Sequence, residues 1–372
     1  MTDEESLTDM VWANAERFGG TIGFRRRAGG SWMDVTTREF ATQVLQLAKG
    51  MIAAGLRPGD RIALLSGTRY EWSLFDFASW FAGCQTVPID ASATAAEVEW
   101  ILSDSGACAV VVETAAHRET VRRVVDRLPE VAWVWQLDGG VHEGDEDVPA
   151  AVDELTALGK QIYDDRAHER RLAVRADDVA TVVYPDGDHP KRVELTHGDL
   201  LADVRATIAA YPRLLRAGNS LLVLLQLADL PARLISLCCV YTRTTLGHGP
   251  DTDDLFTDLG VFRPRVIVAD TELLTRFHDS ARAKAYADGA MFVFDTAEAV
   301  AMDYGARGGA GSLALRLKHA VADRVVYPKL RAAFGGRCVA ALTSGDPLPA
   351  DRMNFFGGIG IDVHELASSR AG

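Results

Sequence analysis

Continuous apolar runs recur along this 372-residue chain, and they constrain its fold more than any other feature. The runs that end at polar or turn residues lie at 61–65, 107–113, 131–137, 180–184, 221–227, 265–270, 338–344 and 360–366. Strands buried on both faces of a parallel sheet have this pattern, whereas strands with one solvent-exposed face alternate apolar and polar residues. Stretches with helical periodicity lie between the runs. We therefore predict an α/β fold built on parallel sheets.

Two helices are predicted with particular clarity. Over 40–54, Phe40, Val44, Leu47 and Met51 lie on one helical face, and Gly55 stands where a helix commonly ends. A second helix over 70–82 is rich in aromatic residues, which we predict to form core. The basic run 25–27 precedes a Gly-Gly pair and is predicted to be the solvated edge of a hairpin.

Composition excludes several classes of protein. The chain has 52 acidic and 39 basic residues, and a net charge of −13 disfavours non-specific binding to nucleic acid. The longest apolar run, 221–227, contains Gln226 and falls far short of the roughly 20 residues that a transmembrane helix needs. The acidic start "MTDEESLTDM" is unlike a signal peptide, and the five cysteines show no C-x-x-C spacing. We expect a cytoplasmic protein.

Residues 138–170 begin with an acidic, glycine-bearing stretch and suggest a surface excursion followed by a helix, and we place a soft domain boundary near 175. This divides the chain into an N-terminal α/β subdomain, 1–175, and a second α/β subdomain, 176–372. Four isolated charges are predicted to be solvated caps and turns, namely Glu113, Asp177, Asp178 and Asp323.

The segment 180–200 carries the strongest candidate for chemistry. A predicted strand leads into a loop with Gly187 and Lys191, after which Thr196 is placed to cap a helix. Backbone N–H groups and one lysine in such a loop can surround a phosphate. Asp186 and Asp188 would repel that phosphate, so an ordinary acidic turn is the alternative interpretation.

Several motifs resemble adenylate-forming ligases, and in particular bacterial long-chain fatty-acid–CoA ligases. "TVVY…PK.VELTHGDL" is similar to the family's phosphate loop, usually written "TIVYTSGTTGxPKGxxLTHxNL". "LLQLADLPARL" resembles "LPLAHVFARL", and "ALTSGDPL…GIDVHEL" resembles the segment with "SGGAPL" and "VLEGYGLTE". The similarity is collinear over about 20–366. It implies two parallel-sheet subdomains plus part of a distorted β-barrel.

The resemblance also implies roles for individual residues. The "SGGAPL" turn, whose backbone flanks adenine in the family, corresponds to Thr343, Ser344, Gly345 and Asp346. Glu365 matches the glutamate of "LEG". Asp229 occupies the place of an aromatic or histidine that lines the carboxylate of the acyl substrate. No residue is assigned a catalytic role.

Other family residues are missing. The family's seven residues before Pro-Lys are replaced by five, Pro185 to His189, with no hydroxyl and with two carboxylates. The tyrosine, threonine and Mg²⁺-binding glutamate of "YGLTE" are absent after Glu365. The family's C-terminal domain, with its catalytic lysine, lies outside this chain. His189, His197, His248 and His364 show no metal-ligand spacing, so no metal site is predicted.

Family members use ATP and Mg²⁺ to make an acyl-adenylate, from which coenzyme A then displaces AMP. We expect this chain to have lost the ATP-dependent step and to bind acyl-adenylate or AMP, and coenzyme A, but not ATP with Mg²⁺. Its partners would be a small-molecule acyl substrate and a sister ligase that makes the adenylate. A non-catalytic acyl-binding or scaffold module and a conventional ATP-dependent ligase are the alternatives.

Overall fold

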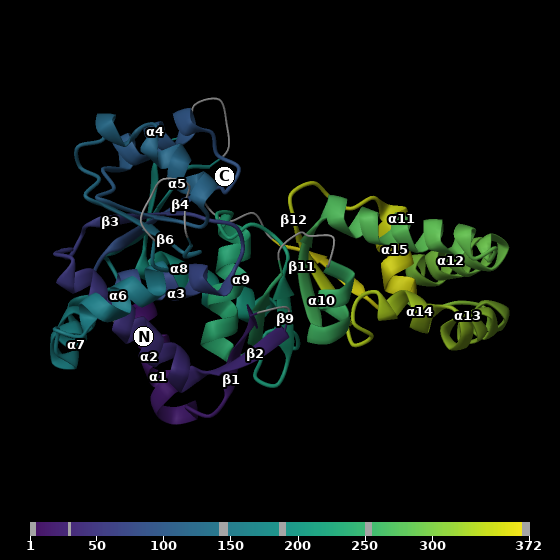
Figure 1. The fold of residues 1–372 in the computed structure, drawn as a ribbon. Coiled ribbons are helices and arrows are strands. Elements are labelled where there is room, and N and C mark those ends of the chain that lie inside the picture. Colours follow the sequence, from purple (N-terminus) through teal and green to yellow (C-terminus); the bar gives the residue numbers. More distant parts are fainter. Residues whose placement is uncertain (1–4, 29–30, 141–147, 186–190, 250–254, 367–372) are drawn as a thin grey trace.

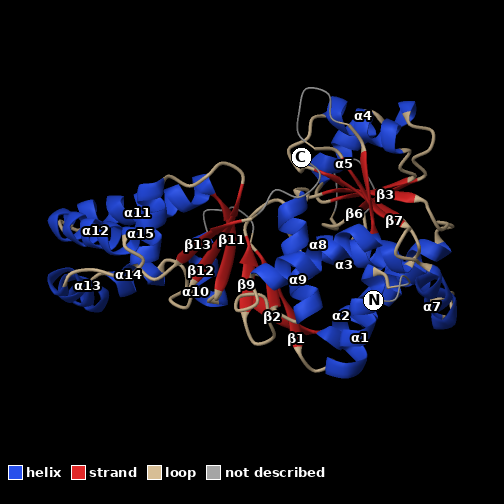
Figure 2. Cartoon of the chain, turned by 180° about the vertical axis from the view of Figure 1, so that it is seen from behind, coloured by secondary structure: helices blue, strands red, loops and turns tan. Residues whose placement is uncertain are grey.

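The structure is a computed structural model that describes residues 5–28, 31–140, 148–185, 191–249 and 255–366. These residues form two sheets with helices on both faces of each (Figures 1 and 2). The α/β fold predicted from the apolar runs is confirmed.

One sheet has seven strands in the order β13-β12-β11-β9-β10-β1-β2. Every neighbouring pair is parallel except β1 with β2, which are antiparallel. The strands are β1 (Ile22–Ala28), β2 (Ser31–Thr36), β9 (Ser220–Val223), β10 (Thr245–His248), β11 (Val266–Asp270), β12 (Ala340–Ser344) and β13 (Asp362–Glu365).

The other sheet has six strands in the order β6-β5-β3-β4-β7-β8, parallel except for the antiparallel pair β7 and β8. Its strands are β3 (Arg61–Leu65), β4 (Gln85–Ile89), β5 (Ala109–Val112), β6 (Trp133–Gln136), β7 (Val179–Val183) and β8 (Val193–Thr196).

The helices in the first half of the described chain are α1 (Leu7–Phe18), α2 (Thr37–Ala53), α3 (Tyr70–Phe81), α4 (Ala95–Ser105), α5 (Ala115–Arg122), α6 (Ala151–Gly159) and α7 (Asp164–Ala173), with a 3-10 turn at Val125–Arg127. The later helices are α8 (His197–Ala210), α9 (Leu230–Thr242), α10 (Leu255–Phe262), α11 (Thr271–Ala287), α12 (Met291–Ala306), α13 (Leu313–Val325), α14 (Tyr327–Ala332) and α15 (Ala350–Gly358).

Three hydrophobic cores occupy the faces of the two sheets. The largest lies between the sheets and is filled by side chains of α1, α2, α3, α8 and α9 together with strands of both sheets. Helices α4 and α5 cover the outer face of the six-stranded sheet, and α10 to α15 cover the outer face of the seven-stranded sheet. Strands with helices on both faces need continuous apolar runs, which explains the pattern in the sequence.

The predicted portion of a distorted barrel is not seen as a closed barrel, because the described strands form two open sheets. The antiparallel pair β1–β2 forms one edge of the seven-stranded sheet and confirms the hairpin predicted around 25–27. Both sheets also take strands from both sides of residue 175, since β7 and β8 join β3–β6 while β1 and β2 join β9–β13. The domain boundary near 175 stays a prediction.

Among the described residues, no helix combines the length and the apolar character required to cross a bilayer.

Candidate functional site

The carboxyl ends of four parallel strands collect most of the residues that the sequence singled out. Strands β9, β11, β12 and β13 are adjacent and parallel, so their carboxyl ends lie at one edge of the seven-stranded sheet. Asp229 follows β9, Ser344 ends β12 and Glu365 ends β13. Ligands of open α/β sheets bind beyond such an edge, at the ends of the strands. This edge is therefore the candidate adenylate site.

The turn after β12 is shaped by its glycine and tied to a neighbouring helix. Thr343 is buried, Ser344 is half-buried, and Gly345 and Asp346 are exposed. Gly345 has a φ of 92°, a conformation that side chains rarely adopt. The Thr271 hydroxyl at the start of α11 donates to the backbone oxygen of Asp346 at 2.6 Å. The turn thus presents its backbone at the surface, as adenine recognition by backbone groups would require.

Glu365 lies beside this turn because β12 and β13 pair in register. Thr343 faces Glu365 across the two strands, and the N–H of Leu366 donates to the backbone oxygen of Thr343 at 2.7 Å. The Tyr211 hydroxyl, just past the end of α8, donates to the backbone oxygen of Glu365 at 3.0 Å. These contacts use backbone atoms of Glu365 and leave its carboxylate at an exposed position.

Asp229 is exposed and stands at the N-cap position of α9. The segment that leads to it is fixed by Thr68, which is buried in the loop after β3. The Thr68 hydroxyl donates to the backbone oxygen of Leu225 at 2.5 Å and accepts from the N–H of Leu227 at 3.1 Å. These two hydrogen bonds join the six-stranded sheet to the segment that carries Asp229.

A buried ion pair anchors α9 one turn further on. The Arg233 guanidinium donates to both carboxylate oxygens of Asp76 in α3, at 2.7 and 2.6 Å, and both side chains are only 3% exposed. It also donates to the hydroxyls of Thr86 and Thr181, on strands β4 and β7. The start of α9, and hence Asp229, is held against the six-stranded sheet by these bonds.

The candidate phosphate loop is only partly described. Gly187 lies outside the described residues, and Lys191 is exposed. Thr196 caps α8 as predicted, because its hydroxyl accepts from the N–H of Asp199 at 3.0 Å while the Asp199 carboxylate accepts from the N–H of Thr196. Thr196 ends β8, which pairs antiparallel with β7, whereas Lys191 lies two residues before β8 begins, so about 15 Å of extended chain separates them.

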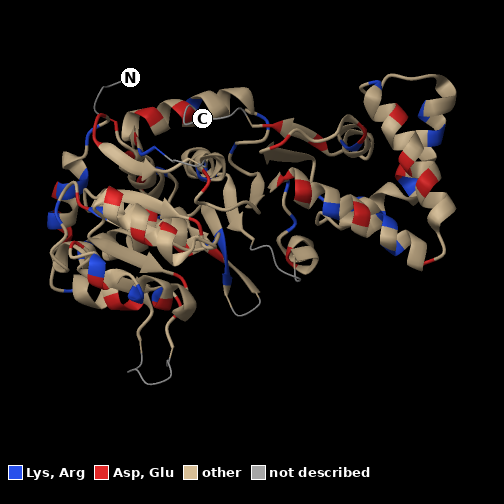
Figure 3. Cartoon of the chain, turned by 90° about the horizontal axis from the view of Figure 1, so that it is seen from above, with Lys and Arg blue, Asp and Glu red and all other residues tan. Residues whose placement is uncertain are grey.

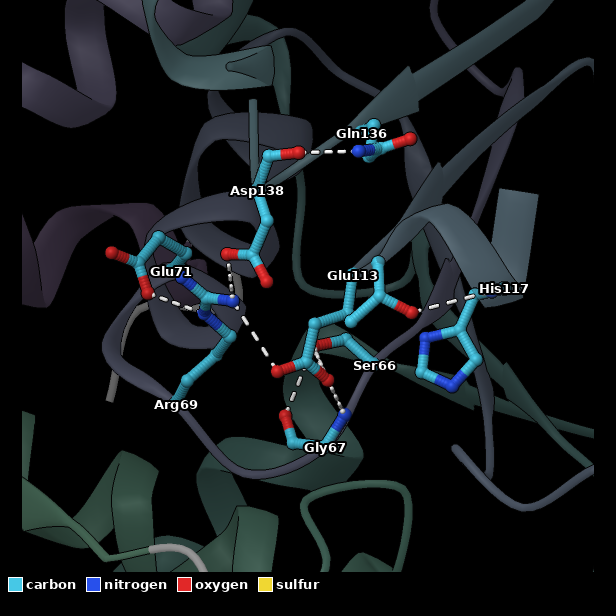
Figure 4. A network of polar contacts seen from close by, with 9 residues as sticks. Ser66, Gly67, Arg69, Glu71, Glu113, His117, Gln136 and Asp138 are labelled. Carbon is cyan, nitrogen blue, oxygen red and sulfur yellow. Dashed lines mark hydrogen bonds and ion pairs between the residues drawn. The ribbon is translucent and has the colours of Figure 1, made fainter. Parts of the chain in front are cut away.

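A polar network that sequence reasoning missed lies at the carboxyl ends of β3, β5 and β6 (Figure 4). The Glu113 carboxylate accepts from the N–H of Gly67 at 2.8 Å and pairs with Arg69 at 3.3 Å. Arg69 also pairs with Asp138 at 2.8 Å and with Glu71 at 2.7 Å. The prediction that Glu113 is merely a solvated cap is wrong. Its position directly after a buried strand was the available signal.

The histidines near the core are not arranged as metal ligands. Burial lowers the pKa of both His197 and His248 to about 3, so both stay neutral at physiological pH. The His248 ring lies 3.2 Å from the Ser73 hydroxyl. In the part of the chain that the structure describes, no three His, Cys, Asp or Glu residues gather as a metal site would require.

Comparison with known proteins identifies the family and agrees with the fold. The AMP-binding enzyme family matches residues 11–366. The chain belongs to this family. It is 36% identical, over 98% of its length, to the long-chain-fatty-acid–CoA ligases FadD15 of Mycobacterium bovis and Mycobacterium tuberculosis. It spans 60% of the length of these relatives.

Solved structures agree on the fold of this family member. The N-terminal domain of FACL13 from Mycobacterium tuberculosis superposes with a TM-score of 0.69 at 18% identity, over 97% of this chain and 75% of that one. The A domain of a carboxylic acid reductase from Segniliparus rugosus superposes with a TM-score of 0.70 at 14% identity, over 97% of this chain and 59% of that one. The chain therefore has the fold of the N-terminal domain of an adenylate-forming ligase.

Proposed function

We propose that this chain forms the acyl- and adenylate-binding part of a fatty-acid–CoA ligase and that it has lost ATP-dependent adenylation. The observation that carries the proposal is the register of β12 with β13, which keeps the turn at Thr343–Asp346 and Glu365 at one edge of the sheet. The ligands would be an acyl-adenylate or AMP, with coenzyme A as acceptor. A sister ligase in the cytoplasm would make the adenylate.

Electrostatics supports the loss of the first step. ATP without Mg²⁺ carries about four negative charges, whereas an acyl-adenylate carries one. Asp229, Asp346 and Glu365 are exposed at the carboxyl edge of the sheet, and Asp186 and Asp188 lie in the shortened loop. A carboxylate about 4 Å from a phosphate charge costs ~4 kcal/mol at an effective dielectric of about 20. The acidic residues therefore penalise ATP much more than the adenylate.

The metal ligand that would offset this repulsion is also missing from the sequence. The motif that supplies an Mg²⁺-binding glutamate in the family is replaced after Glu365 by Leu366, Ala367, Ser368 and Ser369. An acyl-adenylate needs neither pyrophosphate contacts nor Mg²⁺. The retained turn and the lost phosphate motifs are consistent with a protein that receives an adenylate already made.

A conventional ATP-dependent fatty-acid–CoA ligase is the second candidate. The 36% identity to FadD15, sustained over 98% of the chain, favours it.

Exchange of labelled pyrophosphate into ATP separates the two proposals. We expect no exchange with fatty acids of 8 to 18 carbons above the signal of heat-inactivated protein, while FadD15 of Mycobacterium tuberculosis serves as the positive control. A variant with 185–189 replaced by the family's TSGTTGR tests whether the loop alone is responsible. Clear exchange by the unmodified chain would refute the loss of adenylation and favour the conventional ligase.

A further inference from the structure

Helix α13 exposes an apolar stripe along its whole length. Leu313, Leu317, Val321 and Val325 are 82%, 67%, 59% and 58% exposed. Their spacing of four residues places one on each turn with a drift of about 40° per step, so they form one continuous stripe. On the opposite side of α13, Leu315 and Ala322 are buried, and Ala322 belongs to the core that covers the seven-stranded sheet. One side of the helix is thus packed against the protein, and the other side exposes apolar side chains to solvent.

Basic residues frame this stripe. At about 100° per residue, Lys318 lies on one side of it, Arg316 on the other and Arg324 within it. All three are exposed, and within the described ranges none of them forms an ion pair. We call the stripe together with these three residues the α13 face.

The surrounding sequence is basic although the whole chain is acidic. Acidic and basic positions are interspersed over most of the molecule (Figure 3). From 304 to 345, however, there are seven basic residues and one acidic residue, in a chain of net charge −13. The acidic residue, Asp323, is paired with Arg331 at 2.7 Å, and Asp303 on the neighbouring helix is paired with Arg307 at 2.8 Å. The cations of the α13 face are therefore not neutralised by these neighbouring carboxylates.

The position of α13 separates it from most of the negative charge. Figures 1 and 2 both place it in the helical lobe at the end of the molecule farthest from the six-stranded sheet. Charges in water are screened over about 8 Å at physiological ionic strength, so the acidic residues around the six-stranded sheet have little effect there.

We propose that the α13 face binds the surface of an anionic membrane, with the helix lying in the plane of the interface. Helices that bind this way insert an apolar stripe at the headgroup boundary and place Lys and Arg against anionic lipids. Membrane binding by the α13 face does not depend on the function proposed for the adenylate site.

Two alternative occupants fit less well. A second copy of the chain, related by a two-fold axis, would bring Arg316, Lys318 and Arg324 of both copies into one interface, where like charges repel. The hot spots of protein–protein interfaces are poor in leucine and valine, which are the residues that form this stripe.

Co-flotation of the 372-residue chain with vesicles tests the proposal. We expect binding to vesicles of phosphatidylglycerol and phosphatidylcholine in equal parts, and at least tenfold weaker binding to phosphatidylcholine alone. Leu317→Glu/Val321→Glu should weaken binding to the anionic vesicles at least tenfold. Arg316→Gln/Lys318→Gln should weaken it by about tenfold or more, because each basic residue near an anionic surface adds to the attraction.

Leu172→Glu on α7 is the matched control, since Leu172 is 62% exposed but lies in a different part of the molecule. It should leave vesicle binding unchanged. The melting temperature of each variant checks its folding, and the glutamine variant keeps the apolar stripe in case the glutamate variant is unstable. Absence of vesicle binding would overturn the proposal, as would equal binding to neutral and anionic vesicles. Concentration-dependent dimerisation abolished by Leu317→Glu/Val321→Glu, without vesicle binding, would assign the face to self-association instead.

Discussion

Removing the carboxylate of Asp76 should strongly destabilise the protein, because it leaves a buried positive charge without its counter-ion. Asp76→Ala leaves the Arg233 guanidinium buried with only the hydroxyls of Thr86 and Thr181 as partners, beside the ring of Trp80 at 5.6 Å. A buried charge that loses its counter-ion typically costs about 3–5 kcal/mol. Burial already raises the pKa of Asp76 despite the opposing effect of Arg233, which agrees with a site where isolated charge is costly.

The assay is urea unfolding followed by tryptophan fluorescence. We expect Asp76→Ala to lower the free energy of unfolding by ~3–5 kcal/mol. The double variant Asp76→Ala/Arg233→Leu should lose less free energy of unfolding than the two single variants lose together, because it leaves no buried charge without a counter-ion. Glu169→Ala, which breaks an exposed pair with Arg166 at 3.2 Å, is the control and should stay within about 1 kcal/mol of the parent.

Two results would refute this reasoning. One is a loss of less than about 1 kcal/mol in Asp76→Ala, which would mean that the guanidinium remains solvated. The other is a double variant whose loss equals the sum of the single losses, because the two side chains would then not be coupled.

Two further predictions concern the pH dependence of the free energy of unfolding and the packing of helix α15. Burial lowers the pKa of His197 and of His248 to about 3 in the folded protein. As the pH falls from 7 to 5, only the unfolded chain therefore takes up protons on these two side chains, whose ordinary pKa is about 6.5. The free energy of unfolding should fall by ~2 kcal/mol per histidine over this range. Urea titrations at both pH values measure this fall, and a His248→Gln variant that shows the same fall would contradict it. Gly358→Ala should be destabilising because its Cβ would lie 2.0 Å from the backbone oxygen of Ala301, whereas Gly357→Ala meets nothing within 4 Å and should be neutral or stabilising by up to ~1 kcal/mol. Equal melting temperatures for these two variants would show that Gly358 in α15 does not lie close to Ala301 in α12.

The sequence predicted the regular elements well where burial alone determines them. Strand β3 and the aromatic helix α3 lie where the apolar runs placed them, within one residue. Strands β4 (QTVPI) and β10 (TLGH) were missed, because they contain few large apolar residues and also carry Pro88 and Gly247. The run 221–227 continues past the end of β9 at Val223, since Leu224, Leu225 and Leu227 are buried after the strand ends. The burial of these three leucines, rather than the length of the strand, determined the length of that run.

The candidate site was predictable only as far as its motifs were local. The capping box at Thr196 and the turn at Gly345 depend on residues close in sequence. The contacts of Arg69 with Glu113 and Asp138 join residues 44 and 69 positions apart, and the pair of Arg233 with Asp76 joins residues 157 apart. These contacts depend on the order of strands in the sheets, which the apolar runs do not specify.

Titration calorimetry with a non-hydrolysable acyl-sulfamoyl-adenosine analogue and with ATP·Mg²⁺ tests the central claim most directly. The turn at Thr343–Asp346 can hold adenine through its backbone, while the carboxylates of Asp229 and Glu365 at the same edge repel a triphosphate. We predict that the analogue binds at least tenfold more tightly than ATP, a difference of ~1.4 kcal/mol. Equal affinities, or no detectable binding of either ligand, would contradict the account.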